Sequence, residues 1–187
     1  MRKKLKILAV ITIIIISLGI GINSYFDLGF RTLKYYTTTS SDLTNENISG
    51  VKLNQSIKSE EFLSNVGELK SQDNALFDYY QSNKGMVVVT EKNDDKIIRI
   101  FTYSSDFKTD NGISIRNDSK DFKTNKGISL GNDLNTILEQ YGYQYYERFE
   151  QGSMIIGYID KRNKRTLEFC MIDNKVYSIR LDKSIMY

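Results

Sequence analysis

Histidine, proline and tryptophan are absent from this 187-residue chain, and cysteine occurs once, at Cys170. Without histidine the chain lacks the commonest general base and the commonest metal ligand, and a Cys–His nucleophile within the chain is excluded. A single cysteine cannot form an intramolecular disulfide, and free cysteine is usually a small buried apolar residue. Calcium-loop spacing and phosphate-binding glycine loops are also missing. We therefore expect no catalytic residues, no metal site and no cofactor.

Excess charge of one sign is also missing from most of the chain. The formal net charge is +3, from 26 basic and 23 acidic residues, but four basic residues lie before the first apolar run. When these four are set aside, acidic residues outnumber basic residues by one. Nucleic-acid binding needs a basic face, so we expect no nucleic-acid partner.

One long apolar run is present, and it lies close to the N-terminus. Residues 7–22, ILAVITIIIISLGIGI, follow a basic tip that contains the four basic residues mentioned above. As a helix they would be roughly 24 Å long, whereas the hydrocarbon core of a membrane is roughly 30 Å thick. We predict a signal-anchor helix that contacts the lipid bilayer from Leu5 to Ile22. The basic tip places the N-terminus in the cytoplasm and the body outside, as a single-pass cell-membrane protein. The alternative is a cleaved signal peptide, which would make the protein secreted.

Two later stretches share one plan, a turn followed by a capped helix and a stop glycine. In 124–142 an apolar stripe is formed by Leu134, Ile137, Leu138 and Tyr141, at the spacing of one helix face. Asn132 or Asp133 can cap the start, and Gly142 suits a left-handed end. In 50–67 the corresponding helix is 59–66, ending before Gly67.

Each of these helices is followed by predicted antiparallel strands. They are 75–81, 86–91 and 96–103 in the first half, and 143–150, 154–160, 166–172 and 175–181 in the second. The sequence therefore predicts an α+β fold: an N-terminal transmembrane helix, then two tandem repeats, each a short helix packed on an antiparallel β-meander. The predicted boundaries are a basic tip and anchor at 1–23, an aromatic segment and polar linker at 24–49, a first repeat at 50–106, a linker at 107–123 and a second repeat at 124–187.

The segment KGISLGNDLNTILEQYG, followed by strands that end in DNKVYSIRL, is similar to the helix-plus-sheet repeat of β-lactamase-inhibitor-like proteins. It also resembles the small lipoprotein of the outer-membrane β-barrel assembly machinery. The resemblance covers roughly residues 50–183 and implies a bacterial protein that binds other proteins or acts as an envelope scaffold. The chain lacks the two-cysteine pattern of the secreted inhibitors and the lipoprotein cysteine.

Three functions follow from these observations. The first is a membrane-anchored, extracytoplasmic protein-binding module or envelope scaffold without catalysis, whose partner is a protein or cell-wall component outside the membrane. The second is an inhibitor or immunity-type protein that acts against a secreted enzyme or toxin. The third is a cell-wall-active enzyme, because paired carboxylates can cleave glycosidic bonds and Glu147, Glu150, Asp160 and Glu168 lie on predicted strands. Such acids are far more often solvated strand residues, so we expect no enzyme.

Alternation along the last strands predicts a binding face. Leu167, Phe169 and Met171, with Tyr177, Ile179 and Leu181, should pack on the 134–141 helix. The opposite face should then present Glu168, Cys170, Ser178 and Arg180, joined by residues of the two preceding strands. Tyrosine and arginine dominate protein interfaces, so the candidate binding residues are Tyr146, Arg148, Tyr158, Glu168 and Arg180.

Overall fold

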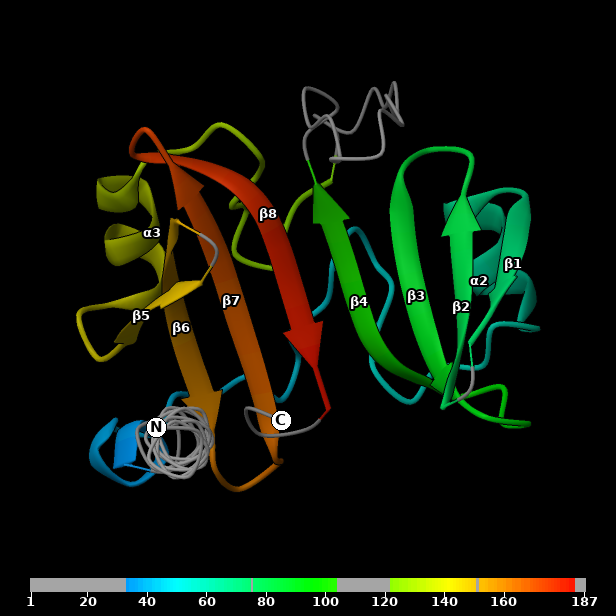
Figure 1. Ribbon diagram of the computed structural model, residues 1–187, viewed down its shortest axis with the longest axis horizontal. Coiled ribbons are helices and arrows are strands. Elements are labelled where there is room, and N and C mark those ends of the chain that lie inside the picture. Colours follow the sequence, from blue (N-terminus) through cyan, green and yellow to red (C-terminus); the bar gives the residue numbers. More distant parts are fainter. Residues whose placement is uncertain (1–32, 75, 104–121, 151, 184–187) are drawn as a thin grey trace, which may run out of the picture. The chain divides into compact units, whose positions relative to one another are not determined.

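The computed structural model describes residues 33–74, 76–103, 122–150 and 152–183 (Figure 1). The chain divides into two compact units, one that includes Met1–Thr37 and one that includes Thr38–Ile185. In the first unit the described residues, 33–37, are helical. All of the helices and strands named below belong to the second unit.

The second unit is built on one antiparallel sheet of eight strands. Their order across the sheet is β1-β2-β3-β4-β8-β7-β6-β5 (Figure 1). The strands are β1 (Leu69–Asp73), β2 (Phe77–Ser82), β3 (Met86–Glu91), β4 (Ile97–Tyr103), β5 (Tyr146–Glu150), β6 (Ser153–Asp160), β7 (Arg165–Ile172) and β8 (Lys175–Asp182). Two sets of four consecutive strands meet where β4 pairs with β8, in a register that places Phe101 opposite Arg180.

Two short helices, α2 (Glu60–Val66) and α3 (Leu134–Tyr141), lie on the same side of the sheet (Figure 1). We call the side that they cover the inner face and the opposite side the outer face. Each helix begins at a side-chain cap, because Ser59 accepts from the backbone N–H of Phe62 and Asp133 accepts from that of Thr136. Such caps satisfy backbone donors that have no partner inside the helix.

The core lies between the inner face and the segments that cover it. Loop residues Leu43, Ile48 and Val51 are almost wholly buried, although the first two lie in the segment 24–49, which was predicted to end in a polar linker. They pack with apolar side chains from both helices and from the central strands: Phe62, Val66, Val88, Ile100, Ile137, Ile156, Tyr158, Leu167, Phe169, Ile179 and Leu181. One core therefore extends beneath both halves of the sheet.

The glycine predicted to end the second helix does so. Gly142 has φ +84° and ψ −176°, and its N–H donates to the carbonyl of Leu138 at 2.8 Å. This region of backbone space is essentially restricted to glycine.

Replacing Gly142 with alanine should therefore lower the free energy of unfolding by about 1–3 kcal/mol through backbone strain. A side chain would not clash there, since no atom lies within 4 Å of an added Cβ. Glu139→Ala on the same helix is the control and should change stability little. Equilibrium denaturation of both variants measures the difference, and equal stabilities would contradict the assigned helix end.

The fold class predicted from the sequence is wrong. Instead of a transmembrane helix and two helix-on-meander repeats of an α+β protein, the described residues form mainly one continuous β-sheet with two short helices. The two sets of strands merge because β4 and β8 hydrogen-bond to each other, which joins Arg99 to Asp182, 83 residues later. Periodicity identifies a strand but not its neighbour, so this pairing had no sequence signal.

The predicted membrane location is also overturned. The expected anchor, from Leu5 to Ile22, lies outside the described residues. Within the part of the chain that the structure describes, no helix combines the length and the apolar character needed to cross a membrane. This finding conflicts with the predicted signal-anchor helix and with the predicted single-pass membrane location.

Candidate functional site

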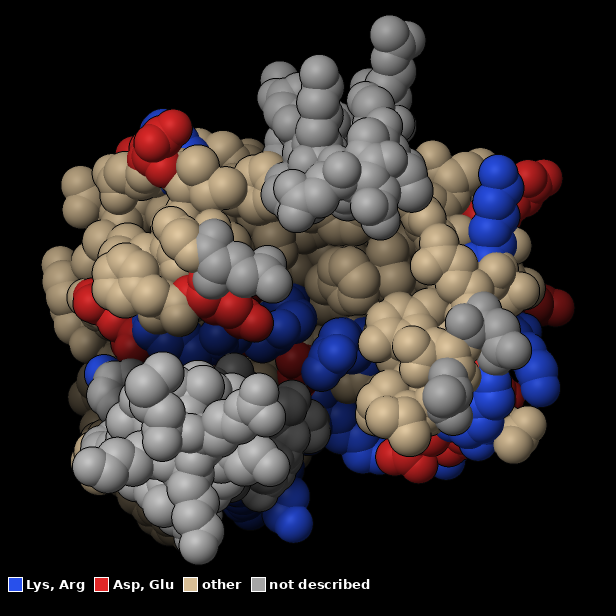
Figure 2. Space-filling view, in the orientation of Figure 1, with Lys and Arg blue, Asp and Glu red and all other residues tan. Residues whose placement is uncertain are grey.

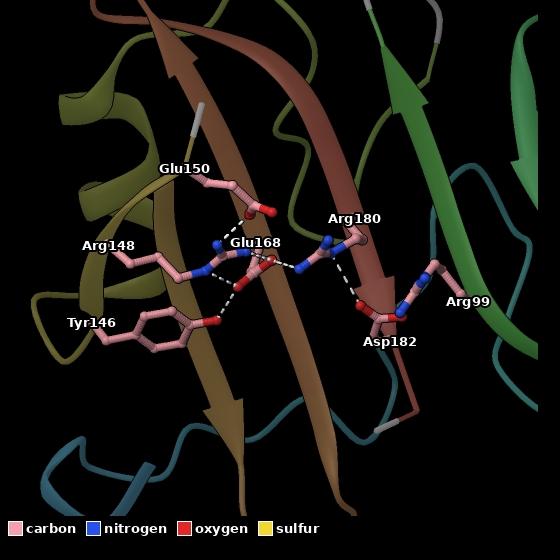
Figure 3. Close-up of polar contacts among 7 residues, drawn as sticks. All are labelled: Arg99, Tyr146, Arg148, Glu150, Glu168, Arg180 and Asp182. Atoms are coloured by element: carbon pink, nitrogen blue, oxygen red, sulfur yellow. Dashed lines mark hydrogen bonds and ion pairs between the residues drawn. The ribbon is translucent and has the colours of Figure 1, made fainter. Parts of the chain in front are cut away.

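A cluster of charged side chains and one tyrosine lies on the outer face (Figure 3). It draws on four strands of the sheet, β5, β7, β8 and β4. We call these residues the outer cluster: Arg99, Tyr146, Arg148, Glu150, Glu168, Arg180 and Asp182. Three arginines and three carboxylates balance in charge, so the cluster as a whole is neutral.

Glu168, on β7, is the centre of the outer cluster. Arg148 holds its carboxylate with two hydrogen bonds of 3.0 Å, one from Nε and one from Nη2. Tyr146 donates its hydroxyl to the same carboxylate, and Arg180 pairs with it from the other side. Burial alone would raise the pKa of Glu168, but Arg180, Arg148 and Tyr146 together hold that pKa below its ordinary value. The side chain is therefore a buried, ionised acceptor.

A second carboxylate, Asp182, connects the two halves of the sheet. Arg180 Nε lies 3.1 Å from one of its oxygens, and Arg99 on β4 pairs with the other (Figure 3). Burial raises the pKa of Asp182, against the opposing effect of the two arginines. The series of ion pairs therefore continues from β8 to β4, where the two halves of the sheet meet.

A glycine allows the outer cluster to form. Gly157 on β6 is paired with Tyr146 on one side and with Glu168 on the other. The tyrosine ring crosses directly over the glycine to reach the carboxylate, since a Cβ added at Gly157 would lie 2.0 Å from the ring carbon Cζ. Glycine within a strand often marks such a close approach.

The structure brings together four of the five predicted binding residues: Tyr146, Arg148, Glu168 and Arg180. Tyr158 is placed elsewhere. It is paired with Leu167, is fully buried in the core, and donates its hydroxyl to the carbonyl of Gly142 at 2.8 Å. Its predicted position on the outer face is wrong, because the register of β6 against β7 turns it to the inner face.

Three members of the outer cluster were missed as binding residues: Arg99, Glu150 and Asp182. Arg99 and Asp182 lie on strands of different halves, so only the β4–β8 pairing brings them together. The sequence did contain one feature from which the position of the outer cluster could have been predicted. Gly157 interrupts the apolar strand MIIGYID, and an isolated glycine in a strand indicates close approach of a neighbour.

Aromatic side chains lie beside the outer cluster at the middle of the sheet. Phe101 and Tyr103 follow Arg99 at every second residue of β4, and their ring centroids are 6.1 Å apart. Arg180 lies opposite Phe101 on β8. We call these four residues the central strip: Arg99, Phe101, Tyr103 and Arg180. Figure 2 shows this face hollowed between β8 and β4, with uncharged residues in the hollow and basic residues beside it.

The central strip presents arginine rather than carboxylate to solvent. The side chains of Arg99 and Arg180 are 26% and 33% exposed, whereas those of Asp182 and Glu168 are 7% and 5% exposed. The buried carboxylates hold the guanidinium groups in fixed positions beside two half-buried rings. This arrangement can receive an acidic group and apolar side chains together, because guanidinium groups bind carboxylates through paired hydrogen bonds.

Comparison of the chain with protein-family models, with curated proteins and with solved structures finds no match. Among the described residues, no three acidic or cysteine side chains are grouped so that they could hold a metal ion. A functional assignment for this chain thus rests on the geometry of the outer face.

Proposed function

We propose that this protein is a protein-binding module that acts without catalysis and contacts its partner through the outer face of the sheet. The observation that carries this proposal is the central strip. Aromatic rings and guanidinium groups lie side by side there, on a face that neither α2 nor α3 covers (Figure 1).

The composition and the rigidity of the central strip both favour binding. Arginine and tyrosine are enriched among the residues that contribute most to interfaces. The arginines are tied to buried carboxylates and the rings stand on the central strands, so little side-chain freedom would be lost on association. The partner that fits is a protein segment with a carboxylate beside apolar side chains.

Two of the carboxylates considered for catalysis in the sequence, Glu168 and Asp160, support binding over acid–base chemistry. Glu168 accepts hydrogen bonds from Tyr146 and Arg148, pairs with Arg180, and has a lowered pKa. Asp160 accepts from the backbone N–H of Leu43 and from Asn163. Both groups hold neighbouring elements in place, whereas a general acid at neutral pH needs a raised pKa.

Site-specific photocrosslinking tests the proposal. A benzoylphenylalanine at position 101 should crosslink to a distinct protein in cells that make the full chain. The same group at position 63 is the control, because Leu63 is 44% exposed but lies on α2. Identical products from both positions would contradict the proposal.

The partner so identified then allows a quantitative measurement. Phe101→Ala and Tyr103→Ala should each weaken its binding by at least about 1 kcal/mol, the usual threshold for an important interface residue. Circular dichroism should show an unchanged fold. Wild-type affinity in both variants would exclude the central strip as the contact surface.

A further inference from the structure

A polar hollow of about 280 Å³ lies among the loops of the second unit, apart from the outer cluster. It is lined by residues 44–47 and by Lys52, Asn125 and Arg165. Neighbouring residues of these loops, such as Leu43 and Ile48, belong to the core under the inner face. The volume is just below the range of about 300–1,000 Å³ that is common for small-molecule sites.

The acceptors of the hollow are largely occupied. Glu46 is 4% exposed, and its carboxylate accepts from the N–H groups of Asn47 and Asn125, at 3.2 and 2.7 Å, and from the hydroxyl of Tyr141 at 2.8 Å. The side-chain oxygen of Asn47 accepts from the N–H of Gly50 at 2.8 Å. A ligand would therefore find few acceptors that are still free.

The donors of the hollow are less occupied. Arg165 uses Nη1 to bind the carbonyls of Leu43 and Thr44, at 3.0 and 2.6 Å, and these contacts fix the position of its guanidinium group. Among the residues that the structure describes, Arg165 Nη2 and Lys52 Nζ have no hydrogen-bond partner. The hollow therefore combines two cations with one carboxylate that already accepts three hydrogen bonds.

We propose that this hollow binds a small anion through a carboxylate or phosphate group, which Lys52 and the fixed guanidinium group of Arg165 receive together. Both anionic groups accept charge-assisted hydrogen bonds from lysine and arginine. The site is independent of the proposed protein-binding face, since it shares no residue with the central strip.

Binding to the full chain can be measured by calorimetry with inorganic phosphate and, separately, with acetate, at an ionic strength held constant with chloride. Phosphate, acetate or both should bind and should raise the melting temperature, because a ligand of the folded state stabilises it. Saturation by phosphate alone assigns the site to phosphate groups, and saturation by acetate assigns it to carboxylates. If neither anion exceeds chloride, the proposal is wrong.

A charge reversal with a matched control tests the location. Lys52→Glu should weaken the affinity at least about tenfold, through the loss of a charge-assisted hydrogen bond and the gain of a repulsive charge. Lys58→Glu makes the same change outside the hollow on another exposed lysine, and it should bind as the wild type does. Equal losses in both variants would show a general charge effect and overturn the site.

Discussion

Gly157→Ala is expected to destabilise the protein by about 3 kcal/mol, because the added methyl group overpacks a filled site. The Cβ would lie 2.0 Å from the Tyr146 ring, which is closer than any real contact. The ring must then leave Glu168, and the carboxylate loses one of its donors while it stays buried. Chemical denaturation would measure the loss of stability.

A double-mutant cycle separates this clash from an effect on the strand itself. Gly157 has no positive φ that alanine could not adopt, so the strand should tolerate alanine once the ring is absent. In a Tyr146→Ala background, Gly157→Ala should cost less than about 1 kcal/mol, since contacting residues couple strongly. An undiminished cost in that background would refute the role of the ring.

Glu168→Ala is expected to cost about 3–5 kcal/mol at neutral pH, the usual penalty for leaving a buried ion pair without one partner. Arg148 and Arg180 would lose their shared carboxylate. Glu150→Ala is the matched control. Glu150 also pairs with Arg148, but its side chain is 43% exposed, and exposed ion pairs contribute at most about 1 kcal/mol.

The cost of Glu168→Ala should also depend on pH. Because the folded-state pKa of Glu168 is lowered, its ionised form stabilises the protein above the ordinary carboxyl pKa. This contribution is lost as the pH falls through the folded value. The stability difference between wild type and Glu168→Ala should therefore shrink in acid. A difference that stays constant from pH 7 into the acid range would show that Glu168 acts by packing alone.

The sequence by itself determined the local elements of the second unit. The apolar stripe, the cap and the stop glycine of the second helix lie where they were predicted, and so does Gly67 after the first helix. The turn between β7 and β8 consists of Asp173 and Asn174, both with positive φ, as expected for a two-residue hairpin. These features depend on the backbone preferences of residues that are close together in the sequence, so a short stretch of sequence is enough to predict them.

One edge strand was missed. β1 has the sequence LKSQD, which lacks the alternation of apolar and polar residues that indicates a half-buried strand. It forms because β2 offers a hydrogen-bonding edge. The strand is therefore a product of its neighbour rather than of its own pattern.

Only the tertiary structure decided which strands meet and which side chains share a face. A register shift between Cys170 and Met171 pairs Met171 with Val176, so Val176 joins the core in place of the expected Tyr177. The pairing of β6 with β7 turns Tyr158 inward, and that of β4 with β8 carries Arg99 to Asp182. Alternation determines which residues of one strand share a face of the sheet. Register and strand pairing are set by packing across the whole core, and they determine which residues of other strands these side chains meet.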